Sequence, residues 1–200
     1  GMYVLADEIY EHINYIGRHE SIAQFPGMKE RSIIVNGVSK AYAMTGWRIG
    51  FIAAPEWIVK GCNKLQGQYT SGPCSVSQKA AEAAYTMSQD CVETMRQAFE
   101  RRRDLIVELA KQIPGLEVNK PEGAFYLFPK CSGFYGKSYE GKTISNSTDL
   151  AMFLLEEGHV ATVGGDAFGD PDCFRMSYAT SDDNIREAMR RIKETLAKLK

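Results

Sequence analysis

Residues 37–50 read Gly37-Val38-Ser39-Lys40-Ala41-Tyr42-Ala43-Met44-Thr45-Gly46-Trp47-Arg48-Ile49-Gly50. The segment begins at the end of an apolar, strand-like run and carries Lys40 three residues after a glycine. Partial burial beside such a strand favours the neutral form of a lysine amine, which is the nucleophilic form. Eight residues later, Arg48 offers a planar pair of donors that matches phosphate oxygens. The segment therefore predicts a reactive lysine near an anion-binding arginine.

Three short apolar runs around this segment indicate a β-sheet. Tyr3–Ala6 stops at Asp7, as a buried parallel strand that ends in an acidic loop would. Arg31–Gly37 is strand-like and breaks at its glycine. Ile49–Ala54 is closed by the proline that follows it. We expect a strand in each run.

Helix-forming residues dominate the next part of the chain. Ser75–Gln112 is rich in Ala, Glu, Gln, Met and Arg, has no internal Gly or Pro, and is ended by Pro114-Gly115. It predicts one long helix or two abutting ones. We place a domain boundary at its end, which gives one domain over residues 1–112 and a second over residues 113–200.

The second domain alternates strand and helix signals. Strands are expected at 116–118, 124–128, 160–163 and 174–178, with a Gly/Ser/Lys-rich loop from 130 to 146. Ser147 is a candidate cap for a helix that runs to Glu157, with Gly158 at its end. Ser181 is the candidate cap of a final helix. In that helix the residues that fall on one apolar face are Ile185, Met189, Ile192, Leu196 and Leu199.

The bulk composition excludes several classes of partner. Apolar residues make up 44% and charged residues 24% of the chain, and the net charge is −1, so neither nucleic acid nor an anionic membrane is expected to bind. No apolar run is long enough to span a bilayer. The five cysteines lack Cys-x-x-Cys spacing and predict reduced thiols in a cytoplasm, with no disulfide frame and no metal site. The histidines show no ligand spacing and are interpreted as structural.

Residues 37–50 resemble the cofactor-attachment segment of class I, aspartate-aminotransferase-type enzymes, which use pyridoxal 5'-phosphate and have fold type I. A small residue three before the lysine, a hydroxyl residue before it, the arginine eight after it and the following glycine all fit. The order of the other segments also resembles the C-terminal half of that family. The resemblance implies an α/β, truncated pyridoxal-phosphate transferase fold. About three strands of the family's seven-stranded large-domain sheet would be joined to a small C-terminal α+β domain.

The resemblance also implies roles for individual residues. Lys40 would hold the cofactor as an imine and shuttle protons, and Arg48 would bind its phosphate. Asp7 would pair with the protonated ring nitrogen and Tyr10 would hydrogen-bond the ring oxygen. Arg175 aligns with the arginine that clamps the substrate's α-carboxylate.

Ser39 is a weaker candidate for a cofactor contact. Many relatives carry a phosphate-binding serine where this chain has Gly37, and Ser39 lies too close to the lysine to replace it. The first half of relatives supplies a Gly-rich phosphate loop, a stacking aromatic and an asparagine, and the sequence contains none of these before Asp7. We therefore expect the chain to be incomplete and inactive alone, with a separate N-terminal half or a homo-oligomer as partner.

Two kinds of function stay open. The first is an amino acid aminotransferase that passes an amino group to a 2-oxo acid. The sequence of residues 44–48 favours this function by analogy. A carbon–sulfur lyase or a cyclopropane-forming synthase of the same fold would share Lys40, Asp7, Arg48 and Arg175. The second kind is a truncated, catalytically silent remnant that persists as a folded or oligomeric domain.

Overall fold

The computed structural model describes all residues from Gly1 to Lys200 and divides into two compact units. Unit 1 comprises Gly1–Gln97 and unit 2 comprises Ala98–Lys200. The division falls inside one helix, α3 (Asp90–Ala110). The domain boundary at residue 112 refers to the large and small domains of the family, and it stays a prediction.

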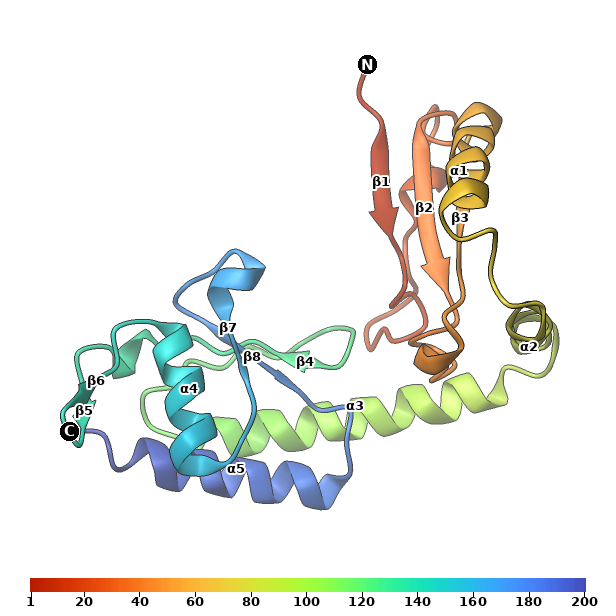
Figure 1. The fold of residues 1–200 in the computed structure, drawn as a ribbon. Coiled ribbons are helices and arrows are strands. Elements are labelled where there is room, and N and C mark those ends of the chain that lie inside the picture. Colours follow the sequence, from red (N-terminus) through yellow and green to blue (C-terminus); the bar gives the residue numbers. More distant parts are fainter. The chain divides into compact units, whose positions relative to one another are not determined.

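A three-stranded sheet forms the centre of unit 1 (Figure 1). Its strands are β1 (Val4–Asp7), β2 (Ser32–Gly37) and β3 (Gly50–Ala53), in that order across the sheet. β1 and β2 are parallel, whereas β2 and β3 are antiparallel. All three strands lie where the apolar runs predicted them.

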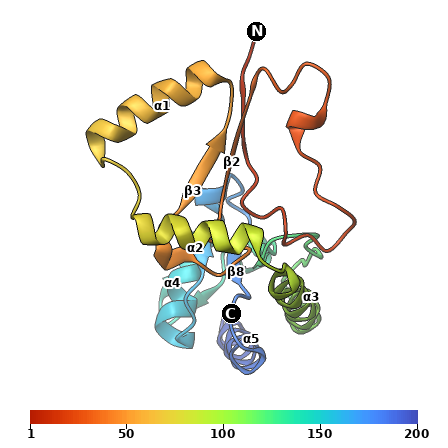
Figure 2. The same cartoon turned by 90° about the vertical axis from the view of Figure 1, so that its right-hand side faces the viewer.

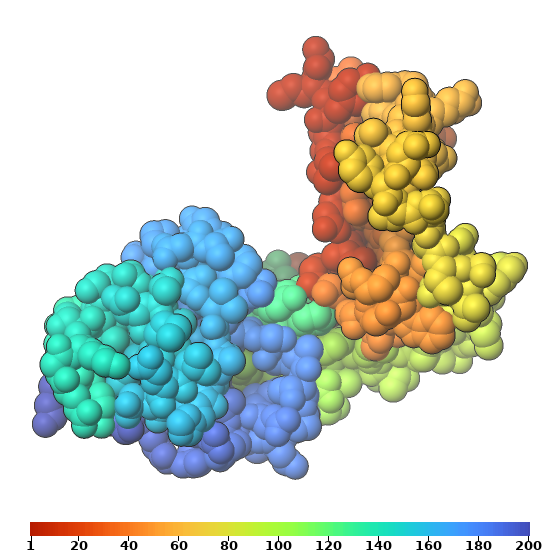
Figure 3. All heavy atoms as spheres, viewed as in Figure 1, coloured from red at the N-terminus to blue at the C-terminus, as the bar shows by residue number.

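The expectation that the first strand is buried is wrong. β1 is an edge strand whose only neighbour in the sheet is β2. Tyr3 is 54% exposed and Leu5 is 66% exposed, and Figure 3 shows the red atoms of this segment uncovered on the face in view. A strand is buried only when both of its faces are covered, which does not happen here. The apolar residues of this segment therefore form a surface that is exposed in this chain.

Other segments of unit 1 lie on both sides of this sheet (Figure 2). Seen edge-on in Figure 2, the loop between β1 and β2, which contains the 3₁₀ turn η1 (Ile22–Gln24), lies toward one side and α1 (Glu56–Tyr69) toward the other. α1 is not among the helices predicted from the sequence, because Gly61 and Gly67 weaken its helical pattern. No residue of α1 is buried.

Two helices occupy the long segment without Gly or Pro. They are α2 (Ser75–Thr86) and α3, separated by residues 87–89. The side chain of Gln89 donates hydrogen bonds to the carbonyls of Ala84 and Met87, at 2.9 and 2.7 Å. These bonds satisfy carbonyls at the end of α2 that a continuing helix would have used.

Unit 2 combines a small antiparallel sheet with helices. The sheet has the order β4 (Tyr126–Leu127), β8 (Phe174–Ser177), β7 (Val163–Gly164), and η4 (Gly165–Phe168) follows β7. A hairpin of β5 (Ser138–Tyr139) and β6 (Lys142–Thr143) follows η3 (Ser132–Phe134) inside the predicted loop. The remaining helices are α4 (Ser147–Gly158) and α5 (Asp182–Leu196). The fully buried side chains include Leu127, Leu150, Leu154, Phe174, Tyr178 and Ile192.

Two local expectations in unit 2 are corrected. Residues 116–118 form no strand, because Glu117 makes only an isolated bridge with Lys130. The cap of α4 is Asn146, whose side chain accepts a hydrogen bond from the Asp149 amide at 2.8 Å. The Ser147 hydroxyl instead accepts from the Gly165 amide at 3.0 Å and is buried.

The cap of the last helix is confirmed. The Ser181 hydroxyl accepts a hydrogen bond from the Asn184 amide at 3.2 Å, as an N-cap serine does. The five residues predicted for the apolar face are all buried: Ile185, Met189, Ile192, Leu196 and Leu199. Leu199 lies beyond the last helical residue, Leu196.

A close approach of two glycines joins β2 to β3. Gly37 pairs with Gly50 across the sheet. A Cβ atom on Gly37 would lie 2.7 Å from the Ile49 carbonyl oxygen and 2.9 Å from the Gly50 Cα. Both contacts are with backbone atoms, so a side chain here requires the strands to separate.

We predict that Gly37→Ala destabilises unit 1 by about 1–3 kcal/mol, because overpacking against backbone forces a strand to move. Urea unfolding followed by tryptophan fluorescence measures this, since both tryptophans, Trp47 and Trp57, lie in unit 1. The matched control is Gly61→Ala, at a position with no atom within 4 Å. It should be neutral or should stabilise α1 by up to about 1 kcal/mol. Equal effects of the two substitutions would contradict the close approach.

The five free cysteines differ in burial and in acidity. Burial is the main cause that raises the pKa of Cys131 to about 11 and that of Cys173 to about 12. Cys62, Cys74 and Cys91 are exposed, and hydrogen bonds from the Ser77 and Val76 amides lower the pKa of Cys74.

We predict that iodoacetamide at pH 8 labels Cys74 fastest and leaves the two buried thiols unmodified, because the thiolate is the reactive form. At that pH a thiol with a raised pKa is almost wholly protonated, while a lowered pKa increases the thiolate fraction. Mass spectrometry of the folded chain measures the order, and a denatured sample is the control in which all five react. Rapid labelling of Cys131 or Cys173 in the folded chain would contradict the assignment.

Candidate functional site

The register of the sheet brings three separate segments to one edge. Asp7, at the end of β1, is paired with Val35 of the parallel strand β2. Gly37, at the end of β2, is paired with Gly50, at the start of β3. The segments that carry Tyr10, Lys40 and Arg48 therefore all lie at the same edge of the sheet, the one at which β1 and β2 end and β3 begins. Carboxyl ends of parallel strands are the usual place of ligand sites in open α/β sheets.

Lys40 and Tyr10 meet at this edge. The Lys40 Nζ lies over the Tyr10 ring, 6.0 Å from its centroid, and both side chains are half-buried. Val38 and Ala41 on either side of the lysine are buried and fix the loop. The structure thus brings together two residues that the sequence predicted as partners in one site.

Aromatic side chains hold the lysine loop against the rest of unit 1. The Tyr42 ring lies 5.2 Å from the Tyr85 ring on α2, which lies 5.8 Å from Phe51 on β3. The Tyr42 hydroxyl donates to Gln89 Oε1 at 2.8 Å. Burial, followed by electrostatic interactions with Tyr42 and with Glu11, raises the pKa of Tyr85 to about 12. Both tyrosines are therefore neutral at physiological pH and act by packing.

Asp7 and Arg48 are exposed at the same edge. Asp7 Oδ1 accepts a hydrogen bond from the Ile9 amide at 3.2 Å, which forms a local turn. Arg48 has the left-handed backbone conformation, with φ 55°, after η2 (Thr45–Trp47). It donates one bond, from Nη1 to the Thr45 carbonyl at 2.9 Å. Its remaining guanidinium donors are available to an anion.

The residues at this edge fit pyridoxal phosphate in the nature of their side chains. An amine, an arginine, a carboxylate and a phenol are the groups that this cofactor needs for its aldehyde, phosphate, ring nitrogen and ring oxygen. The tight Gly37–Gly50 approach leaves no room for a serine at position 37, so a phosphate contact from that position is absent. Ser39 is half-buried beside the lysine. The fit therefore depends on Lys40, Arg48, Asp7 and Tyr10.

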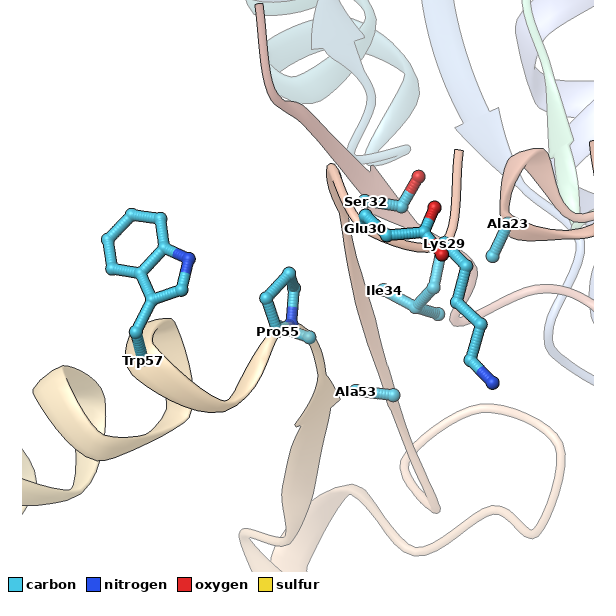
Figure 4. A pocket seen from close by; sticks show the side chains of 9 residues that line it. Ala23, Lys29, Glu30, Ser32, Ile34, Ala53, Pro55 and Trp57 are labelled. Atoms are coloured by element: carbon cyan, nitrogen blue, oxygen red, sulfur yellow. The ribbon is translucent and has the colours of Figure 1, made fainter. Parts of the chain in front are cut away.

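A separate hollow of unit 1 lies at the other end of the sheet. It measures about 790 Å³ and is lined by residues at the start of β2 and the end of β3, among them Ser32 and Ala53. Figure 4 shows Pro55 and Trp57 on one side of it and Lys29 and Glu30 on the other. None of the predicted site residues lines it, so its size does not make it the site.

Arg175 lies in unit 2. Its guanidinium carbon lies 3.9 Å from the Phe168 ring centroid and 4.4 Å from that of Tyr126. The Arg175 side chain is half-buried. Two rings thus orient a guanidinium by cation–π contacts and leave its donors for a ligand.

No group of three or more His, Cys, Asp or Glu side chains is arranged to hold a metal ion. No helix has the length and apolar content needed to cross a bilayer. His19 instead contacts the buried carboxylate of Glu8 at 3.2 Å, a structural role.

The sequence analysis overlooked two residues that border the site, Glu11 and Asn36. Asn36 is 7% exposed, which is unusual for an asparagine. It lies one residue before Gly37, at the end of a predicted strand. A polar residue directly before a strand-terminating glycine was the available signal.

Comparisons with known proteins identify the family of the chain. The family described as aminotransferase class I and II matches residues 1–192. The bifunctional aspartate aminotransferase and glutamate/aspartate-prephenate aminotransferase of Petunia hybrida is 48% identical over 98% of the chain, which covers 42% of that relative. An aspartate aminotransferase of Rhizobium meliloti (strain 1021) is 48% identical over 96% of the chain and 47% of the relative.

A crystal structure of the aspartate aminotransferase from Rhizobium meliloti matches with a TM-score of 0.94 and 47% identity, over 99% of this chain and 50% of that one. The chain spans about half the length of the curated relatives it matches. The expected α/β fold, a truncated pyridoxal-phosphate transferase fold, is thereby confirmed. The chain belongs to the class I and II aminotransferase family.

Proposed function

We propose that this chain provides the lysine-bearing part of an aspartate-type aminotransferase, which moves an amino group from an amino acid to a 2-oxo acid. The observation that carries the proposal is the single sheet edge at which the segments of Lys40, Tyr10, Asp7 and Arg48 meet. Family membership and relatives that are aspartate aminotransferases support it.

Each residue at the edge has a separate task. Pyridoxal phosphate, when bound, supplies an electron sink next to the substrate's α-carbon. The Lys40 amine would hold the cofactor at its aldehyde carbon, and the same amine would carry a proton at the substrate's α-carbon. Arg48 binds the phosphate, with Ser39 as a minor neighbour. Asp7 keeps the ring nitrogen protonated and Tyr10 hydrogen-bonds the ring oxygen.

Arg175 would bind the substrate's α-carboxylate. The rings of Phe168 and Tyr126 orient its guanidinium before any ligand arrives. A bidentate arginine fixes a carboxylate in one plane, which an ammonium does not do. Fixing the substrate lowers the entropy that must be lost on reaching the transition state.

We propose that activity requires further polypeptide, either the remaining half found in relatives or a second copy. The outer edge of β1 has no partner strand, and Leu5 in β1 and Tyr3 just before it are exposed. An open strand edge with apolar residues is a surface for pairing with another chain. The cytoplasmic location predicted from reduced thiols stays a prediction, and all five cysteines are free in the structure.

We predict that pyridoxal phosphate added to the 200-residue chain gives the absorbance band of a lysine-linked cofactor. Borohydride reduction should then leave the pyridoxyl group on Lys40, because the loop that holds its amine beside Tyr10 is fixed by packing. Peptide mass spectrometry identifies the modified residue. Lys40→Ala should abolish the band, while Lys64→Ala, on the exposed face of α1, should retain it.

A band of equal strength in Lys40→Ala would show random modification of surface lysines. Such a result would favour the catalytically silent remnant over the enzyme.

We predict that the chain becomes active when it is fused to the first half of the Rhizobium meliloti aspartate aminotransferase. In this fusion Arg175→Lys should raise KM for aspartate by about 10–100-fold, because the planar clamp is lost. Steady-state kinetics with aspartate and a 2-oxo acid measure this. The control is Arg186→Lys, at an exposed position of α5. An unchanged KM would contradict the role of Arg175. Release of ammonia in place of a transferred amino group would favour a lyase.

A further inference from the structure

Asn36 forms a bridge between two segments of the candidate site. Its side-chain Oδ1 accepts a hydrogen bond from the Gly37 amide at 2.7 Å. Its Nδ2 donates to Glu11 Oε1, also at 2.7 Å. Asn36 is buried, so water competes little for these bonds. One side chain thus contacts both the segment that leads to Lys40 and the segment that contains Tyr10.

Glu11 belongs to a compact turn after β1. The Glu11 amide donates to the Glu8 carbonyl at 3.0 Å, and the Ile13 amide donates to the Tyr10 carbonyl at 2.8 Å. At its base the turn is joined to β2 by the bond from the Glu8 amide to the Val35 carbonyl, at 2.9 Å. The Glu11–Asn36 bond is a second connection to β2, directly beside Tyr10.

A second polar side chain, that of His12, lies near the Glu11 carboxylate. His12 Nε2 approaches the same oxygen at 3.4 Å. The charge of Glu11 is, after burial, the next cause that raises the pKa of Tyr42. The position of the carboxylate beside the end of β2 is given by its 2.7 Å bond to Asn36.

We propose that Glu11 and Asn36 are positioning residues, whose hydrogen bond holds the turn of Tyr10 against the loop of Lys40. Neither side chain is assigned a contact with cofactor or substrate. The bond fixes the position of the Tyr10 ring over the Lys40 amine, a contact seen at 6.0 Å. The inference rests on the proposed function in that it assigns this pair of residues to a cofactor site.

The test uses single and paired substitutions in the 200-residue chain. Glu11→Ala and Asn36→Ala each remove the bond, and the double variant shows whether their effects are coupled. Glu11→Gln keeps an acceptor oxygen for Asn36 Nδ2 and is the conservative rescue. Ser21→Ala is the matched control, because it removes a bond of the same 2.7 Å length to Glu8, in the same loop.

The first measurement needs no cofactor. Competitive acetylation with acetic anhydride, read by mass spectrometry, gives the reactivity of each lysine amine. Loss of the bond frees the Tyr10 turn, so Lys40 should react about 3- to 10-fold faster in Glu11→Ala and Asn36→Ala. The double variant should react no faster than the singles, and Glu11→Gln and Ser21→Ala should match the original chain. Other lysines should be unaffected.

The second measurement is the dissociation constant and absorbance maximum of bound pyridoxal phosphate. We expect Glu11→Ala to weaken binding about 10-fold and to shift the maximum, with recovery in Glu11→Gln. Equal changes in Ser21→Ala, or no faster acetylation of Lys40 in either alanine variant, would overturn the positioning role. If the original chain binds no cofactor but Lys40 acetylation changes as expected, the proposed function fails and the hydrogen-bonded link stands.

Discussion

The structure of unit 1 depends on the contact between two glycines. Where β2 meets β3, Gly37 lies opposite Gly50 with no room for a Cβ atom. This pairing sets the register of the antiparallel strands, and register decides which residues leave a sheet at the same edge. Because β1 is parallel to β2, the end of β1 arrives at that edge as well. A chemical site can then be assembled from three short loops.

The chemistry at that edge is held by contacts of different kinds. Burial of Val38 and Ala41 fixes the lysine loop, aromatic contacts attach it to α2 and β3, and the bond between Glu11 and Asn36 connects it to the Tyr10 turn. Arg48 stays exposed, with one donor used by its own turn. The residues proposed to touch a ligand therefore differ from those that hold them in place, as expected for a site built on a rigid sheet.

Part of this arrangement could be predicted from sequence. The strands and the Ser181 cap depend on local patterns, and the Lys40 segment is long enough to identify a family. The exposure of β1 does not follow from its own apolar pattern, because it depends on which partners cover a strand. The bridge of Asn36 and the break before α3 depend on side chains that meet only after folding. The orientation of Arg175 by two rings likewise depends on side chains that meet only after folding.

The central claim, that strand register gathers the site, is tested most directly by solution NMR of the isotopically labelled chain. The account predicts cross-strand NOEs between Gly37 and Gly50 and between Asp7 and Val35. It also predicts contacts between the Tyr10 ring protons and the side chain of Lys40. NOEs that pair Gly37 with Phe51 would show a register shifted by one residue. In that case the side chains of β3 would face the opposite side of the sheet, and the account would be contradicted.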